Sequence, residues 1–167
     1  STTGNRDALL NERIKLCLWG RDKRDWCDFG ITGIVQMNPV VALEKVPELR
    51  SVLRNPMSFE DQMKYKYMLL IDGNTNKWTV DSFFTKSLSL MMGSKDMLWY
   101  YPLLIDGTHY VGVERDEIVK KIQYYNSNPK EAQFIVQNGN ELAKKLFNQN
   151  MCRRYLINLF QGIAHNK

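Results

Sequence analysis

The chain has 167 residues, of which 44% are hydrophobic and 25% are charged, a composition ordinary for a globular protein that buries its own core. No run approaches 18 apolar residues, so the sequence predicts no membrane span. The formal net charge of +5 suits an anionic partner, but basic residues are scattered among acidic ones. Without a basic stripe, a nucleic-acid-binding protein is the least favoured class.

The cysteines and histidines predict no metal site. Cys17, Cys27 and Cys152 are an odd number without metal-ligand spacing, and His109 and His165 are far apart in the sequence. Reduced cysteines in a cytosolic protein are the simplest interpretation, with a bridge between Cys17 and Cys27 as the open alternative.

The first third of the chain predicts one strand and a broken helix. Residues 13–19 alternate charged and apolar side chains, which predicts a strand over 14–19 that ends at Gly20. Residues 31–37 fit a strand or a short helix equally well. Apolar spacing over residues 40–54 predicts a helix in two parts, with Pro47 able to open the second part. The sequence SFED (58–61) then predicts a capping box.

The rest of the chain alternates strands with helices. Strands are predicted at 66–71, 88–92 and 109–113, with a helix of about 11 residues after Gly73 and a turn at Asp106-Gly107 before the last strand. Beyond Arg115 the pattern is helical, interrupted by a stop and start signal at 126–129. This alternation predicts an α/β fold, a Rossmann-like parallel sheet with helices on both faces, formed as one domain over residues 1–167.

The segment YKYMLLIDGNTNKWTVDSFF (65–84) predicts an anion site, because an apolar strand runs through a Gly turn into a helix. Backbone N–H groups and the positive end of a helix dipole meet at such a turn, and ligands of parallel sheets bind beyond the carboxyl ends of the strands. The candidate phosphate-binding residues are Gly73, Asn74, Thr75, Asn76 and Lys77. Ordinary helix capping by Asn74 or Thr75 is the alternative.

A second group of candidates lies in the charged loop after residue 19. Arg21 and Arg24, ahead of Lys23, are candidates for binding a diphosphate, because a planar guanidinium matches phosphate oxygens. Asp25 and Asp28 are weak candidates for a catalytic base. The alternative for both groups is a solvated loop in which aspartates balance arginines.

Residues 60–165 resemble the carboxyl-terminal half of glycosyltransferase family 90, the capsule-associated and protein O-glucosyltransferase family. The order and spacing of the following motifs carry this resemblance: KYKY (64–67), LLIDG (69–73), WYYPLL (99–104), HYVGV (109–113) and AQFIVQNGNELAKKLF (132–147). More weakly, KLCLWGRDKRD (15–25) is similar to the strand and basic loop that begin the same half.

The resemblance implies an inverting, metal-independent transferase of GT-B architecture, of which this chain is the half that binds a UDP-sugar. The implied acceptor is a hydroxyl of a protein or glycan, and further domains of the same polypeptide are expected, because the family's catalytic carboxylate lies in the other half. Relatives in large DNA viruses imply a cytoplasmic location. The secretory lumen is the alternative if the parent chain carries a signal peptide.

Two positions depart from the family pattern. Thr79 stands where the family commonly has an arginine for the diphosphate, and Leu98 where it often has a glutamate for the ribose. A non-catalytic binding or assembly module with the same fold is therefore the alternative function. Trp99, Tyr100 and Tyr101 are candidates for stacking on a base or sugar, with core packing as their alternative.

Overall fold

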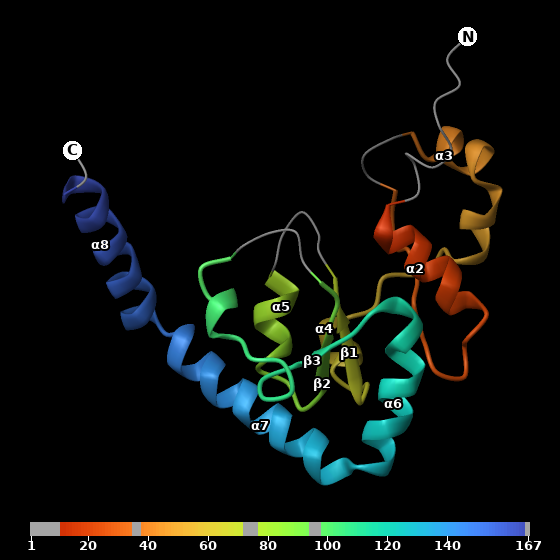
Figure 1. The fold of residues 1–167 in the computed structure, drawn as a ribbon. Coiled ribbons are helices and arrows are strands. Elements are labelled where there is room, and N and C mark those ends of the chain that lie inside the picture. The colour runs from red at the N-terminus through yellow and green to blue at the C-terminus, as the bar shows by residue number, and fades with distance from the viewer. Residues whose placement is uncertain (1–10, 35–37, 72–76, 94–97, 166–167) are drawn as a thin grey trace. The chain divides into compact units, whose positions relative to one another are not determined.

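The structure is a computed structural model that describes residues 11–34, 38–71, 77–93 and 98–165. The chain divides into two compact units, residues 1–58 and 59–167 (Figure 1). The expectation of one domain over residues 1–167 stays a prediction.

The first unit is helical. Its elements are α2 (Glu12–Arg21), α3 (Pro39–Lys45) and the 3-10 helix η1 (Pro47–Ser51). Helix α3 begins with Pro39 after the N-cap Asn38, and η1 begins at Pro47, which confirms the predicted helix in two parts. Its apolar core joins α2, α3 and η1 through the following buried residues: Cys17, Ala42, Val46, Leu49 and Val52.

The prediction of a strand over residues 14–19 is wrong, because this segment lies inside α2. The Asn11 side chain caps the helix by accepting a 3.0 Å hydrogen bond from the Ile14 backbone N–H, and Lys15 pairs with Glu12 one turn away. Leu16, Cys17 and Gly20 are the buried positions, a spacing that also fits a helix. Capping and this spacing favour the helix over the alternating pattern that suggested a strand.

The second unit contains a parallel sheet, as predicted. Its strands in the described residues are β1 (Tyr67–Leu70), β2 (Leu88–Met91) and β3 (Val111–Gly112), in the order β1-β2-β3. Tyr67 pairs with Leu88, and Leu90 pairs with Val111. All three strands run in the same direction, so their carboxyl ends meet at one edge of the sheet.

Helices cover both faces of this sheet. Tyr67 donates to the Ile122 carbonyl at 3.3 Å, so its face of the sheet is covered by α6 (Ile118–Ser127). On the opposite face, the Ser89 hydroxyl lies 3.2 Å from the hydroxyl of Ser82, the last residue of α5 (Lys77–Ser82). Tyr67 pairs with Leu88, and Ser89 is the next residue of β2. Because side chains alternate along a strand, Tyr67 and Ser89 lie on opposite faces of the sheet. The Rossmann-like α/β architecture is therefore confirmed.

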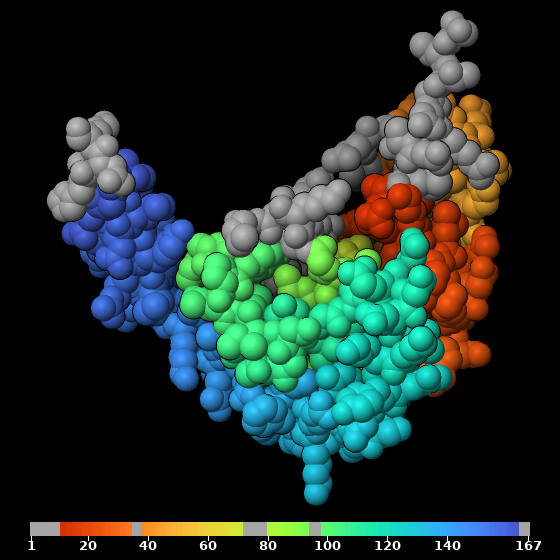
Figure 2. Space-filling view, viewed as in Figure 1, coloured from red at the N-terminus to blue at the C-terminus, as the bar shows by residue number. Residues whose placement is uncertain are grey.

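Two long helices end the chain. Helix α6 stops at Ser127 and α7 (Pro129–Leu146) starts at Pro129, as the stop and start signal predicts. Helix α7 contacts β2, and the chain ends with α8 (Gln149–His165), the dark blue surface in Figure 2. Apolar side chains of α8 stand exposed: Met151, Tyr155, Leu156, Ile157, Leu159, Phe160 and Ile163. No helix in the described ranges is both long enough and apolar enough to cross a bilayer.

Candidate functional site

A pocket in the first unit holds the charged candidates from the loop after residue 19. Its volume is about 360 Å³, within the usual range for sites of small ligands. The lining residues come from the end of α2, the loop after it and the chain after η1: Gly20, Arg21, Arg24, Cys27, Asp28, Phe29 and Arg54. Three of these residues are arginines and one is an aspartate, so the pocket favours an anion.

Arg21 is oriented by two neighbours. Its Nε donates to Asp22 Oδ1 at 2.9 Å, and its Nη1 donates to the Ser51 hydroxyl at 3.3 Å. The hydrogen bond and charge of Asp22 raise the pKa of Arg21, while Arg21 lowers the pKa of the Asp22 carboxyl through the same contact. Arg21 lies in the last turn of α2, where the carbonyl end of the helix stabilises a cation.

Arg24 and Lys23 differ in their surroundings. Lys23 lies over the Trp19 ring, 4.3 Å from its centroid, and does not line the pocket. Arg24 lines the pocket, and within the described residues its exposed side chain makes no hydrogen bond or ion pair. Because the pocket lies at the carbonyl end of α2, arginine side chains rather than helix N–H groups would hold an anion there.

Gly20 and Phe29 shape one wall of the pocket. A Cβ atom on Gly20 would lie 2.5 Å from Cδ2 of the Phe29 ring, closer than packed atoms tolerate. The glycine therefore allows the ring to close directly on α2. Gly20 was expected at the end of a strand, and its role here is close packing inside a helix instead.

Only one of the two candidate bases lines the pocket. Asp28 lines it together with Arg21 and Arg24, whereas Asp25 is exposed outside the lining. Cys27 also lines the pocket. Burial raises the pKa of its thiol more than the nearby charge of Lys23 lowers it, so the thiol stays neutral at physiological pH. Cys17 and Cys27 are both free thiols, so the alternative of a bridge between them is not realised.

The other candidates follow β1 in the second unit. Gly73, Asn74, Thr75 and Asn76 lie outside the described residues. The backbones of Lys77 and Thr79 belong to α5, which has six residues rather than the expected 11 or so. The strand before residues 72–76 and the helix after them are both present, and the anion site expected between these two elements stays a prediction.

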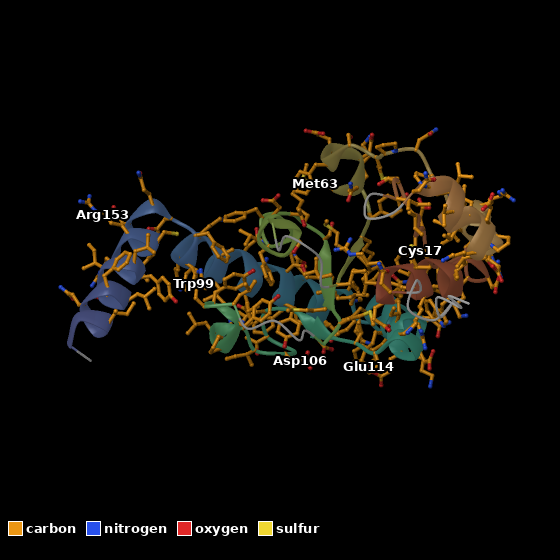
Figure 3. The ribbon with its side chains drawn as sticks, turned by 90° about the horizontal axis from the view of Figure 1, so that it is seen from above. Cys17, Met63, Trp99, Asp106, Glu114 and Arg153 are labelled. Carbon is orange, nitrogen blue, oxygen red and sulfur yellow. The ribbon has the colours of Figure 1, made fainter. Side chains whose placement is uncertain are left out.

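The aromatic candidates take part in packing. Trp99, labelled in Figure 3, stacks on Tyr155 of α8 with ring centroids 4.8 Å apart. Tyr100 is buried against Phe147, and this burial raises its pKa to about 12, which keeps the phenol neutral. These contacts match the alternative of core packing. The stacking of Trp99 on Tyr155 also holds α8 against the segment around Trp99.

His109 has a structural contact. Its Nδ1 accepts a 3.0 Å hydrogen bond from the Ile105 backbone N–H, in the turn that Gly107 closes with a positive φ of 73°. Burial lowers the pKa of His109 below its ordinary value of 6.5, because the charged form is less well solvated. The neutral ring is the form that can accept this hydrogen bond.

We expect His109 to lower the stability of the protein as the pH falls below about 6.5, its ordinary pKa. The folded state holds His109 with a lowered pKa, so its contribution is present above the unfolded pKa and is lost as the pH falls through the folded pKa. Urea unfolding at several pH values measures this slope. His109→Asn offers an amide oxygen as a non-titrating acceptor and should flatten the slope, and an unchanged slope would contradict this role.

Arg54 was missed by sequence reasoning. It follows η1 in the sequence and stands thirty residues beyond Arg24, with no motif to connect the two. The pocket brings it to the same lining as Arg21 and Arg24. Its position next to an apolar pair, Val52 and Leu53, gave no local signal of a ligand.

Comparison with known proteins matches residues 6–166 to glycosyl transferase family 90. Protein O-glucosyltransferase 3 of Homo sapiens is 26% identical over 159 residues, covering 93% of this chain and 30% of that protein. The Mus musculus protein of the same name is 27% identical over 159 residues, again covering 93% of this chain and 30% of that protein. Uncharacterized protein 179R of Invertebrate iridescent virus 6 is 28% identical over 125 residues, covering 65% of this chain and 10% of that protein.

The fold and the pocket together define an α/β protein with a Rossmann-like parallel sheet and an arginine-lined site suited to an anion. The family match extends over most of the sequence and includes the loop and pocket of the first unit. The chain belongs to glycosyl transferase family 90. It spans about a third of the length of the O-glucosyltransferase relatives that it matches.

Proposed function

We propose that this chain is the donor-binding part of a glycosyltransferase that transfers a sugar from a UDP-sugar to a hydroxyl of a protein or glycan. The observation that carries the proposal is the pocket lined by Arg21 and Arg24 in a member of this family. These guanidinium groups would bind the diphosphate. Asp28 lines the pocket and is the candidate base within this chain, whereas the resemblance implies that the catalytic carboxylate lies in the other half.

In this proposal the reaction inverts the anomeric carbon and needs no metal ion. The acceptor hydroxyl loses its proton to a carboxylate and attacks the sugar, while the bond to the UDP oxygen breaks. The negative charge that develops on the leaving diphosphate would be stabilised by arginine side chains positioned in advance. Further domains of the parent polypeptide would supply the second half of a GT-B cleft and the acceptor site.

The location of the reaction is part of the same proposal. A cytoplasmic site agrees with the free thiols of Cys17 and Cys27 in a protein with no bridge among its described cysteines. The secretory lumen is the alternative. Fractionation of cells that express the full-length parent protein would distinguish the two locations.

Arg21→Ala and Arg24→Ala are each expected to cost about 1–3 kcal/mol of UDP affinity, the usual scale of hydrogen bonds to charged groups. Affinity for uridine, which has no phosphate, should barely change. Calorimetric titration of both ligands measures this difference, and Lys77→Ala tests the turn after β1 in the same way. Arg50→Ala is the matched control, because Arg50 is an exposed arginine of the same unit outside the pocket lining.

Two outcomes would contradict the proposal. No binding of UDP or UDP-sugars at millimolar concentration would remove a donor site from this chain. Equal losses for UDP and uridine in the arginine variants would mean general damage to the unit rather than loss of phosphate contacts.

A non-catalytic binding or assembly module is the second candidate. Thr79 and Leu98 stand where the family commonly has an arginine and a glutamate, which favours a site that has lost part of its ligand contacts. Hydrolysis and transfer assays with the complete parent protein separate the two candidates. A protein that binds UDP and never turns over a UDP-sugar would support the module.

A further inference from the structure

We propose that Arg54 is a third phosphate-binding arginine of the pocket and makes it selective for two adjacent phosphate groups over one. This inference rests on the proposed function, because it deepens the description of the site that would hold the UDP diphosphate. Arg54 lines the pocket together with Arg21 and Arg24, although it comes from a separate segment of the chain.

Ser51 connects Arg54 with Arg21. The Ser51 hydroxyl accepts a hydrogen bond from Arg21 Nη1 at 3.3 Å, while the Ser51 backbone carbonyl accepts one from Arg54 Nη1 at 3.4 Å. The hydroxyl itself donates to the Glu48 carbonyl at 2.6 Å, which fixes its direction. Both guanidinium groups therefore contact the same residue and line the same pocket.

The contacts of Arg54 orient its charge without neutralising it. Besides Ser51, its Nη1 donates to the Leu53 carbonyl at 2.9 Å, and both acceptors are uncharged. Within the described residues, no carboxylate lies at ion-pair distance from Arg54, and its Nε and Nη2 make no hydrogen bond. Arg21, in contrast, forms an ion pair with Asp22. Arg54 thus presents donors that suit phosphate oxygens.

Gly30 provides the space for the Arg54 side chain. A Cβ atom on Gly30 would lie 2.3 Å from Arg54 Cγ and 2.9 Å from Arg54 Cβ. These atoms lie near the backbone, so rotation of the distal part of the side chain would not relieve the overlap. The neighbouring backbone is paired, since Ile31 donates to the Val52 carbonyl at 2.8 Å and Arg54 donates to the Ile31 carbonyl at 2.9 Å. This pairing fixes the start of the Arg54 side chain beside Gly30.

Three guanidinium groups exceed what one phosphate group needs. Each arginine can donate two parallel hydrogen bonds, and a terminal phosphate offers three oxygens. Two arginines are enough for a monophosphate, whereas the third finds a partner when a second phosphate is adjacent. The arrangement therefore favours a nucleoside diphosphate over a nucleoside monophosphate.

The test is a set of calorimetric titrations with UDP, UMP and uridine. Arg54→Ala is expected to weaken UDP binding at least about fivefold, while UMP changes less than about twofold and uridine stays unchanged. Gly30→Ala keeps every charge but displaces the Arg54 side chain, so it should also lower the preference for UDP over UMP. Arg50→Ala removes a similar exposed charge outside the lining and should leave all three affinities unchanged.

The outcomes separate this inference from the function on which it rests. If Arg21→Ala and Arg24→Ala weaken UDP binding while Arg54→Ala does not, the third arginine is excluded and the donor site stands. Equal losses of UDP and UMP in Arg54→Ala would overturn the selectivity for two phosphates. If the unsubstituted protein binds no UDP, the proposed function fails as well. Thermal melts of each variant identify a loss of folding, and Arg54→Ala decides the question if Gly30→Ala does not fold.

Discussion

Ile135→Ala is expected to lower the free energy of unfolding by about 2–5 kcal/mol, the range for removing a large buried aliphatic side chain. Ile135 lies on the buried side of α7 and is 0% exposed. The substitution removes apolar contacts and leaves a cavity that rigid neighbours fill only in part. A loss of this size is a large fraction of the total stability of a typical domain.

Urea unfolding followed by circular dichroism measures this loss. Phe134→Ala is the matched control, since Phe134 is the preceding residue of α7 and is 56% exposed. Its substitution should change stability far less than Ile135→Ala does. Similar losses for both variants would mean that α7 does not pack against the rest of the second unit through Ile135.

Gly139→Ala is expected to lower the free energy of unfolding by about 1–3 kcal/mol, the usual cost of overpacking a well-packed core. A Cβ atom there would lie 2.7 Å from the His109 carbonyl oxygen and 3.1 Å from Cδ1 of Phe83. The oxygen belongs to the backbone before β3, so α7 would have to move away from the sheet. This cost outweighs the gain of up to about 1 kcal/mol that alanine brings inside a helix.

Gly162→Ala in α8 is the matched control for this substitution. A Cβ atom on Gly162 would meet no atom within 4 Å, so only the gain in helix propensity remains. The two glycine substitutions should therefore change stability in opposite directions when both variants are unfolded under the same conditions. Stabilisation by both would show that α7 does not approach the His109 backbone as closely as the structure places it.

Local signals in the sequence were sufficient to predict much of the second unit. The apolar runs at 66–71 and 88–92 became β1 and β2. Asn128 separates α6 from α7, which begins at Pro129, because strand period, glycine breaks and proline act within a few residues. The last strand was predicted over 109–113 and is only Val111–Gly112. Asp106 contacts this strand through a bond that the sequence did not predict, since its carboxylate accepts the Gly112 N–H at 2.6 Å.

The first unit was predicted less well, because competing patterns coexist in one segment. Residues 14–19 alternate as a strand would, yet the same segment places Leu16, Cys17 and Gly20 on one helical face. The contacts of Cys17 with the core of α3 and η1 decide between the two. No local rule weighs a period of two against a period of 3.6 when the segment is short.

The sequence by itself determined the family and the parallel α/β class, and it named Arg21, Arg24 and Asp28 from the charged loop alone, three residues that line the pocket. Only the tertiary structure decided which charges gather. It turned Lys23 onto Trp19, left Asp25 outside the pocket and brought Arg54 to Arg21 through Ser51. The physical reason is that hydrogen bonds and close packing between distant segments, such as Gly30 against Arg54, leave no periodic pattern in the sequence.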